Sequence, residues 1–468
     1  MKTYPGLACL VFAVLSFVAP TWTLAQEVES QPAGPVSGWK AGVAATVITP
    51  EKSMWMSGYA SRKTPAEGKI HDLWAKAIVI DDPSGNRIVL VTLDLVGIDR
   101  GTSTSICRAL KEQHDLDRSQ IAISTSHTHS GPVVGQNLIT MYEFGDDQHQ
   151  LITDYTNKLI GDVTHLVGKA IASLEPAVIQ YGEGHCSLAV NRRNNREADV
   201  PKLRENGQLV GPVDHSAPVL AVRHPDGALR AIVFGYACHA TVLSLMDWSG
   251  DWPGFAQIEL EKNHPNAVAL FWAGCGADQN PLPRRTVELA QQYGRQIAAS
   301  VEDVLASPMT NVTGSIKSTY TEIDLALGPL PTKSQVQKDL DDANVYITRR
   351  ARRLMKTFEA DGKLASTYPY PVQLWSIGNG LDMVILGGEV TVEYSLRLKD
   401  ELPGPTTWVA GYSNDVMAYI PSARVLMEGG YEGATSMIYY GLPTVWSDRV
   451  EEHIVRTVHK LKSNSGRE

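Results

Sequence analysis

The sequence predicts an α/β protein: a single large domain with a mixed β-sheet core flanked by helices and a metal site at the carboxyl ends of the strands. Apolar, β-branched runs alternate with amphipathic helical stretches along the chain. Polar, turn-forming residues follow several of the apolar runs directly. No Ser-, Gly- or Pro-rich linker divides residues 26–468, so one domain is expected, although a chain of 468 residues could hold up to about three.

The first half of the chain predicts a hairpin, two helices and a buried strand. Leu73–Ile80 and Arg87–Leu95 are apolar runs separated by a polar, turn-forming segment, which is a hairpin signal. Thr102–Gln113 predicts a helix, Gln120–Thr125 a buried strand and Gln150–Leu174 a long helix.

The second half predicts another hairpin and then strands and helices in turn. Pro218–Arg223 and Leu229–Cys238 flank a Pro-Asp-Gly turn. The remaining elements are expected to be a strand, an amphipathic helix, a charged helical stretch, a last core strand and a closing helix, at Ala267–Ala273, Thr286–Leu305, Lys333–Glu359, Leu381–Leu386 and Val450–Lys460.

Composition excludes several classes of protein. The hydrophobic fraction is 43% and the charged fraction 20%, which are values typical of globular proteins. The net charge is −9, and no Lys/Arg-rich run interrupts it, so the sequence predicts no nucleic-acid partner. A compact enzyme is the expectation that remains.

Residues 1–25 have the pattern of a signal peptide. Lys2 precedes an apolar stretch, Gly6–Ala19, and small residues of the kind preferred by signal peptidases end at Ala25. We therefore expect a secreted or periplasmic protein whose mature part is residues 26–468. An uncleaved anchor is the alternative.

Four cysteines follow that leader, at positions 107, 186, 238 and 275. An oxidising compartment would permit two disulfides, but buried apolar thiols explain the same residues equally well. The sequence has no Cys-x-x-Cys pair, and it therefore predicts no zinc-finger site.

The chemistry is expected where strands end. Gln120–Thr125 runs into a segment that holds His127 and His129, Leu229–Cys238 runs into His239, and Leu381–Leu386 is followed by Glu389. Because ligand sites in open α/β sheets gather at the carboxyl ends of the strands, these side chains are candidates to converge.

Two histidines and a carboxylate are a familiar zinc ligand set, with room left for a water molecule. Within the His-x-His pair, one imidazole would ligate the metal while the other acts as an acid or stabilises an oxyanion. Other roles remain open: His239 could be an ordinary buried histidine, and Glu389 could cap a helix over Val390–Leu398. The sequence has neither a His-Glu-x-x-His helix nor a Gly-x-Ser-x-Gly elbow.

The chain resembles the catalytic N-terminal domain of the neutral/alkaline non-lysosomal ceramidases, zinc amidohydrolases that cleave ceramide. The most specific segments are His127–Pro132 and the Tyr-Glu-Gly-Ala segment that begins at Tyr431. The other matching segments occur in the same order, at 41–43, 48–50, 57–60, 191–192, 249–251 and 387–389.

The resemblance implies one zinc ion per chain, with the ligands His127, His239, Glu389 and Tyr419. Tyr419 is implied because it precedes Tyr431 by the twelve residues that separate the two tyrosines in the family. Three further residues would line the site and stabilise or orient the amide carbonyl: His129, Arg192 and Tyr431.

Two departures from the family concern the substrate. Asn280 occupies the position of a serine that lies beside the scissile amide in the family. The residues after Ser436 are too few for the immunoglobulin-like domain that follows in the family, so that domain is expected to be missing. Asn280 could still donate a hydrogen bond to an oxyanion.

The leading hypothesis is an exported zinc-dependent amidohydrolase that acts on an N-acyl bond, with ceramide as the family substrate. The alternatives are a zinc hydrolase of a smaller or more polar amide or ester, and an exported binding protein without catalysis. A lipid-like substrate could be reached at a membrane surface through a groove or a mobile loop, and 145–147 and Lys333–Glu359 are candidates for such loops. The oligomeric state is not indicated.

Overall fold

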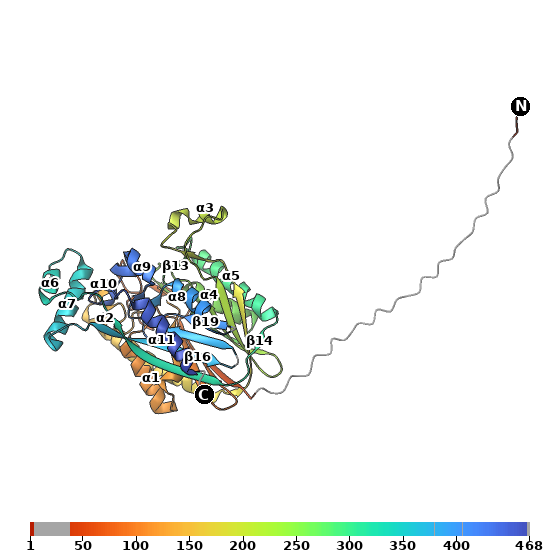
Figure 1. Ribbon diagram of the computed structural model, residues 1–468, viewed down its shortest axis with the longest axis horizontal. Coiled ribbons are helices and arrows are strands. Elements are labelled where there is room, and N and C mark those ends of the chain that lie inside the picture. The colour runs from red at the N-terminus through yellow and green to blue at the C-terminus, as the bar shows by residue number, and fades with distance from the viewer. Residues whose placement is uncertain (4–37, 379, 405, 466–468) are drawn as a thin grey trace.

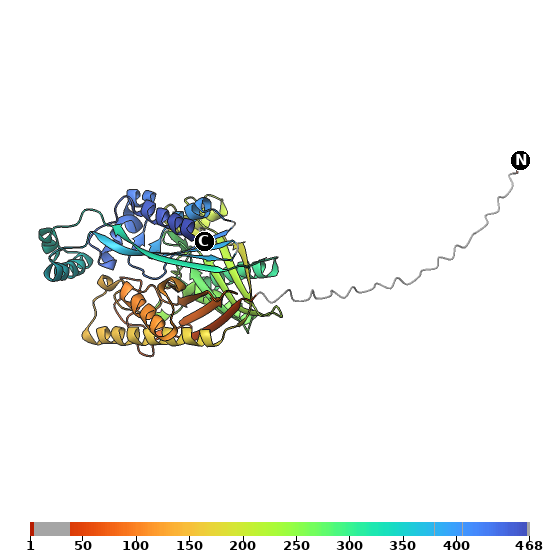
Figure 2. The same cartoon turned by 60° about the horizontal axis from the view of Figure 1, so that its bottom comes forward.

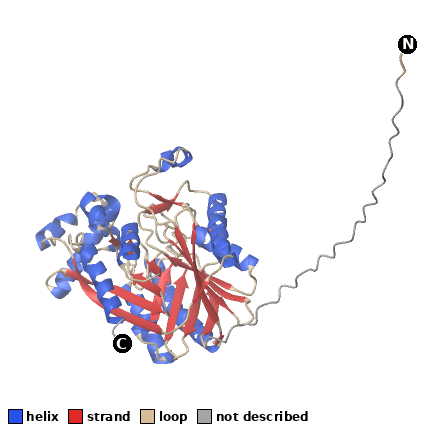
Figure 3. Ribbon diagram, turned by 45° about the vertical axis from the view of Figure 1, so that its right-hand side comes forward, coloured by secondary structure: helices blue, strands red, loops and turns tan. Residues whose placement is uncertain are grey.

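The computed structural model describes residues 1–3, 38–378, 380–404 and 406–465. It shows a mixed α/β domain whose strands form three main sheets, with helices on the outside (Figures 1 and 3). The expected fold class is therefore confirmed. Apart from residues 1–3, the leader predicted over residues 1–25 lies outside the described residues and stays a prediction.

The first sheet has the strand order β5-β4-β3-β1-β6. Its strands are β1 (Lys40–Val47), β3 (Trp74–Asp81), β4 (Arg87–Leu93), β5 (Ile121–Thr125) and β6 (Glu175–Pro176). Helix α1 (Arg100–His114) connects β4 to β5, which are parallel. Helix α1 and the long α2 (Asp146–Ala172) lie side by side over one face of this sheet (Figure 2).

The second sheet has the order β12-β10-β9-β7-β14. Its strands are β7 (Val178–His185), β9 (Ser216–Arg223), β10 (Leu229–Tyr236), β12 (Val268–Ala273) and β14 (Thr310–Asn311). Helix α4 (Asp251–Asn263) connects β10 to its parallel neighbour β12, and it packs against α5 (Val287–Ala306).

The third sheet has the order β15-β16-β17-β19. Its strands are β15 (Ile316–Ala326), β16 (Thr367–Ile377), β17 (Leu381–Leu386) and β19 (Thr406–Ala410). Helix α8 (Val392–Glu401) connects the parallel strands β17 and β19, and α11 (Val450–Ser465) packs against β15 and β16.

The three sheets share one inner core because side chains alternate along each strand. Ile78 and Ile80 of β3 point into that core, whereas Ala77 and Val79 point toward the layer of α1 and α2. Trp272 of the second sheet lies at the centre, with its ring 5.9 Å from that of Trp375 and 5.5 Å from that of Trp408.

Short elements complete the structure. Three two-stranded pairs are formed by β2 (Gly68–Lys69) with β11 (Asp247–Trp248), β8 (Ala189–Asn191) with β13 (Gln279–Pro281), and β18 (Glu389–Val390) with β20 (Tyr419–Ile420). The other helices are α3 (Val200–Glu205), α6 (Lys333–Asp339), α7 (Val345–Asp361), α9 (Ala423–Glu428) and α10 (Met437–Tyr440). Single turns lie at Arg118–Gln120, Ile139–Met141, Glu197–Asp199 and Tyr431–Thr435.

Several expectations need correction. Leu381–Leu386 is not the last core strand, because β19 pairs with it in parallel. The stretch Lys333–Glu359 is two helices, since Asn344 caps α7 by accepting a hydrogen bond from the backbone N–H of Tyr346. These helices project from the body of the molecule (Figure 1). The segment 145–147, which was also proposed as a loop, is the start of α2: Gly145 is its N-cap, and Asp146 and Asp147 are its first residues.

The four cysteines at 107, 186, 238 and 275 are unpaired thiols, three of them buried. The interpretation as small apolar side chains therefore describes them better than disulfide pairing. Among the described residues, no helix is both long and apolar enough to cross a bilayer.

Asp415 makes the stability of this fold depend on pH. Burial raises the pKa of its carboxyl to about 7, although the Tyr368 hydroxyl donates a hydrogen bond to it (2.7 Å). Because the folded-state pKa lies above the ordinary value of 3.8, the stability from this group is complete below pH 4 and is lost as the pH rises to 7. The loss is on the order of 4 kcal/mol.

We therefore expect Asp415→Asn, which keeps an acceptor for Tyr368, to gain stability relative to the native chain between pH 4 and pH 8. Thermal unfolding of both proteins across this range measures the difference. The exposed Asp341→Asn is the matched control and should show no such trend. A difference for Asp415→Asn that stays constant with pH would contradict the assignment.

Candidate functional site

One side chain from each of the three sheets reaches a common point. This point lies at the carboxyl ends of the parallel strands. His127 follows β5, His239 follows β10 and Glu389 follows β17. Each of these strands belongs to the parallel pair of its own sheet. Isolated bridges between Ser124 and Ser413 and between Gly274 and Ala410 hold the edges together. The expected convergence of strand ends is therefore what the structure shows.

The neighbouring parallel strand orients each histidine. After β4, the carbonyl of Val96 accepts a hydrogen bond from Nδ1 of His127 (2.6 Å). After β12, the carbonyl of Gly276 accepts one from Nδ1 of His239 (2.7 Å). A carbonyl can only accept, so both Nδ1 atoms carry the proton, and in the neutral ring Nε2 presents a lone pair.

These lone pairs face a buried carboxylate oxygen. Oε2 of Glu389 lies 3.1 Å from Nε2 of His127 and 3.2 Å from Nε2 of His239. The carboxylate is 3% exposed, and Oε2 has no hydrogen-bond donor among the described residues. Three acceptor atoms at such distances repel one another unless a cation lies among them. The donor set therefore fits a metal ion.

The electrostatics of the site favour neutral imidazole beside charged carboxylate. Burial lowers the pKa of His239 to about 4, and the positive charge of Arg192 acts in the same direction. Burial alone would raise the pKa of Glu389, but positive charge on the adjacent imidazoles outweighs it and holds the pKa well below its usual range. With both rings neutral, a metal ion would supply that positive charge. Neutral imidazole and ionised carboxylate are the protonation states that bind metals.

Tyr419 reaches this point through strand pairing. Strands β18 and β20 are parallel, and their register places Tyr419 directly opposite Glu389. The Tyr419 hydroxyl lies 3.3 Å from Nε2 of His239 and accepts a hydrogen bond from Nη2 of Arg192 (3.1 Å). The structure thus brings together all four residues proposed as ligands: His127, His239, Glu389 and Tyr419.

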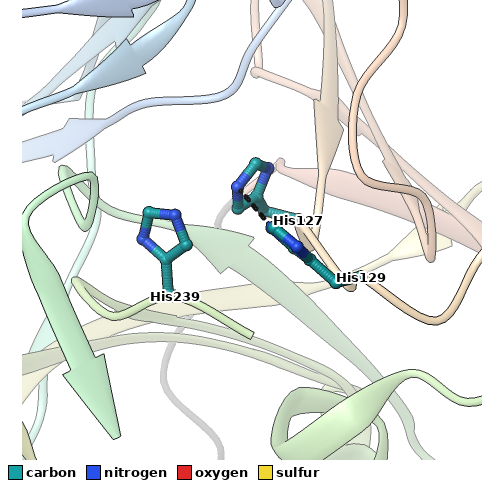
Figure 4. Close-up of side chains that lie close together, drawn as sticks. All are labelled: His127, His129 and His239. Carbon is teal, nitrogen blue, oxygen red and sulfur yellow. Dashed lines mark hydrogen bonds between the residues drawn. The ribbon is translucent and has the colours of Figure 1, made fainter. Parts of the chain in front are cut away.

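His129 adds a third imidazole to the cluster (Figure 4). Its Nε2 is 3.2 Å from Nε2 of His127, and nitrogen atoms of His127, His129 and His239 lie within 4.8 Å of one another. His129 could therefore hold a metal as a third nitrogen ligand or act beside it. Gly58 makes room for this ring because it has no side chain: a Cβ at this position would lie 2.5 Å from the His129 ring. Its φ of +99° is also a conformation that favours glycine.

Arg192 connects the cluster to its surroundings. Strands β8 and β13 pair side by side, which places Arg192 next to Asn280. The guanidinium donates to the carboxylate of Glu432 (2.7 Å), to Oδ1 of Asn280 (3.2 Å) and to the hydroxyl of Tyr419. Burial alone would lower the pKa of Arg192, but Tyr419 and Glu432 raise it well above its usual value, so this cation is permanent.

Tyr431 lies at the rim of the site. It is 41% exposed, and its ring centroid is 5.3 Å from that of Tyr419. The guanidinium carbon of Arg192 lies 5.8 Å from each of the two rings. The structure therefore brings His129, Arg192 and Tyr431, the three residues proposed to act on the carbonyl, around the same cluster.

Two supporting residues were missed in the sequence. The Tyr440 hydroxyl donates a hydrogen bond to Oε1 of Glu389. The Asp251 carboxylate accepts hydrogen bonds from the backbone N–H groups of Leu243 (2.8 Å) and Trp252 (2.7 Å), which fixes the loop after His239. Asp251 belongs to the segment 249–251, which matches the family in sequence. By contrast, nothing in the sequence around Tyr440 indicates its contact with Glu389.

Tyr412 is a third buried group at the site. Its ring centroid is 4.4 Å from that of His127, and its hydroxyl has no hydrogen-bond partner among the described residues. Tyr412 has a φ of 51° and His127 a φ of 59°, so both adopt the left-handed conformation that favours glycine. Such backbone strain is typical of functional sites.

Comparison with known proteins identifies similar chains. A family model described as "Neutral/alkaline non-lysosomal ceramidase, N-terminal" matches residues 39–275, just over half of the 468-residue chain. A protein from Pseudomonas aeruginosa named neutral ceramidase is 27% identical, and the match covers 85% of this chain and 69% of that protein. Neutral ceramidase 1 from Arabidopsis thaliana is 32% identical, and the match covers 58% of this chain and 36% of that protein.

The fold is similar to that of a solved structure. A crystal structure of neutral ceramidase from Pseudomonas aeruginosa superimposes with a TM-score of 0.69 over 90% of this chain and 73% of that chain. The sequence identity in that superposition is 19%. Glu389, Tyr419 and Tyr431 lie beyond the residues matched by the family model, so their place in the site rests on the geometry.

We expect Tyr440→Phe to weaken metal binding by about 10- to 100-fold, because Oε1 of Glu389 loses the donor that orients the carboxylate. Competition with a chelator, read by metal analysis, measures the affinity. Tyr439→Phe is the matched control, since the ring of Tyr439 packs against Tyr346 and Tyr431, whereas it is Tyr440 that bonds Oε1 of Glu389. Equal affinities of the Tyr440→Phe variant and the native chain would show that Tyr440 does not position Glu389.

Proposed function

The chain belongs to the neutral/alkaline non-lysosomal ceramidase family, and on that premise we propose that it is a zinc-dependent hydrolase of linear N-acyl amides. The observation that carries this proposal is the unpaired, buried Oε2 of Glu389 between two Nε2 lone pairs. Ceramide, the substrate that the names of its relatives indicate, is the first candidate.

Zinc is the metal that this donor set suits best. Imidazole nitrogen and carboxylate oxygen are its usual ligands, and the buried tyrosine hydroxyl adds a further oxygen. Each chain would hold one ion through His127, His239, Glu389 and Tyr419. When bound, zinc would supply Lewis-acid activation of the amide carbonyl and of the attacking water.

The residues around these ligands would act on the substrate. Arg192 keeps a permanent positive charge close to the ligands, which favours negative charge developing on a carbonyl oxygen. His129 would donate a hydrogen bond to the same oxygen or transfer a proton, because burial and the neighbouring histidines lower its pKa well below the usual value and keep the ring neutral. Tyr431 would orient the substrate from the rim.

Asn280 also has a suitable donor. Its Oδ1 accepts the hydrogen bond from Nη1 of Arg192, which assigns the oxygen side of the amide. The NH₂ group is then available to donate toward substrate. Asn280 would thereby act as a hydrogen-bond donor in place of the serine of the family, with water as the nucleophile.

We also propose that the protein is exported. This proposal is supported by the basic, apolar and small-residue segments of residues 1–25.

We expect His127→Ala to lose both bound zinc and turnover, because it removes a ligand. His129→Ala should retain zinc and lose about 100- to 1,000-fold in turnover, which is the usual cost of one oxyanion donor. Plasma mass spectrometry gives the zinc content, and release of fatty acid from short-chain ceramide gives the rate. The exposed His149→Ala is the matched control for both.

Each result discriminates between roles. Loss of zinc in His129→Ala would make His129 a ligand. Turnover by a zinc-free His127→Ala variant would disprove the proposed metal dependence. A native protein that binds zinc but hydrolyses no amide or ester would favour an exported binding protein.

A further inference from the structure

A cleft lined mainly by charged residues opens beside the site. It has a volume of about 520 Å³, and its lining includes Arg192, Asn280 and Tyr431, so it is continuous with the residues proposed to hold the amide. Three more arginines line it, Arg193, Arg196 and Arg284, against the two carboxylates Glu197 and Glu432. Leu282 is the aliphatic part of this lining.

The positive charges of the cleft are only partly neutralised by its own carboxylates. Arg192 and Arg193 share the carboxylate of Glu432, at 2.7 and 2.5 Å. Arg284 forms a two-pronged ion pair with Glu197. Together, these three arginines and two glutamates leave one positive charge.

Arg196 adds a second positive charge that is free to turn toward a ligand. Its side chain is 86% exposed, and its contact with Asp199 is long, at 3.8 Å. Two acidic residues outside the lining partly offset the positive charge of the cleft: Asp199 beside Arg196 and Glu428 beside Arg193. Both are exposed, at 54% and 42%, so water weakens their attraction for the arginines as it weakens that of Arg196, and Glu428 is also shared with Arg424.

This lining does not suit a long alkyl chain. An alkyl group placed there would have guanidinium and carboxylate groups as neighbours, and it would gain little from leaving water because burial is favourable only against apolar surface. A carboxylate suits it well, because the planar guanidinium fork matches the two oxygens of that group.

We propose that this cleft binds a carboxylate carried by the substrate, so that the preferred substrates are anionic N-acyl compounds. This inference rests on the proposed hydrolysis of an N-acyl amide and specifies its substrate class. The carboxylate can belong to the amine part, as in an N-acyl amino acid, or to the acyl part, as in the monoamide of a dicarboxylic acid.

The first test compares substrates that differ only in charge. For the zinc-loaded protein, kcat/KM is measured for N-dodecanoylglycine and its neutral glycinamide counterpart, and for succinic acid monododecylamide and its neutral methyl ester. We expect at least one carboxylated member to be preferred by about 10-fold or more, the scale of one charge-assisted hydrogen bond. The pair that shows the preference identifies which part of the substrate enters the cleft.

Charge reversal tests the position of the carboxylate. Arg196→Glu should reduce the preference for the carboxylated substrate by about 5-fold, the scale of an exposed charge pair, and rising salt should reduce it in the native chain. The matched control is Arg108→Glu on the exposed side of α1, which should keep the native preference. Arg196 is exposed, so its replacement leaves the core intact.

A binding measurement separates this inference from the proposed activity. Calorimetry with N-acetylglycine on the full chain should show binding that Arg196→Glu weakens by about 5-fold and Arg108→Glu leaves unchanged. Such binding without hydrolysis of any amide would refute the proposed function and leave the carboxylate site supported. Hydrolysis of neutral amides at least as fast as carboxylated ones, without N-acetylglycine binding, would overturn the carboxylate site alone. Absence of both hydrolysis and binding would refute both.

Discussion

The burial of one carboxylate, that of Glu389, between two imidazoles is the constraint on which the rest of the site depends. A charge taken out of water is costly unless other groups compensate it. Here Tyr440 hydrogen-bonds one oxygen, and the other faces the Nε2 atoms of His127 and His239. The arrangement therefore favours a cation at the meeting point of the three sheets. Arg192 contacts this group through Tyr419, to whose hydroxyl it donates a hydrogen bond, and Glu432 balances its charge.

The three sheets position these ligands by repeating one device. Each contains a parallel pair joined by a helix, and the exit of one strand carries a ligand while the exit of its neighbour supplies a backbone contact. Val96 and Gly276 orient the two histidines in this way, and in the third sheet the N–H of Tyr412 donates to the carbonyl of Gly388, next to Glu389. The left-handed conformations of His127 and Tyr412 are strained, and the packed core around them holds them in place.

Much of this arrangement could be predicted because strand ends can be recognised locally. The apolar runs before His127, His239 and Glu389 place these residues at sheet edges, and the spacing of Tyr419 from Tyr431 follows a family pattern. Long-range pairing has no such local signal: the contact between Tyr440 and Glu389 depends on the packing of α10. Strand β16 was also missed because it contains Pro369 and Pro371, which argue against a central strand. These prolines are tolerated because they pair with β15 in the part of β16 that extends beyond β17.

The shared tryptophan core limits how the molecule can move. Trp272, Trp375 and Trp408 lie between the sheets and are each no more than 2% exposed. Separating any two sheets would expose these rings, at a cost of several kcal/mol for each at about 25 cal/mol per Å². The sheets therefore behave as one rigid block, and the histidines and the carboxylate keep their spacing whether or not a ligand is present. A ligand is therefore expected to enter at the rim, where Tyr431 and the side chain of Arg196 are 41% and 86% exposed.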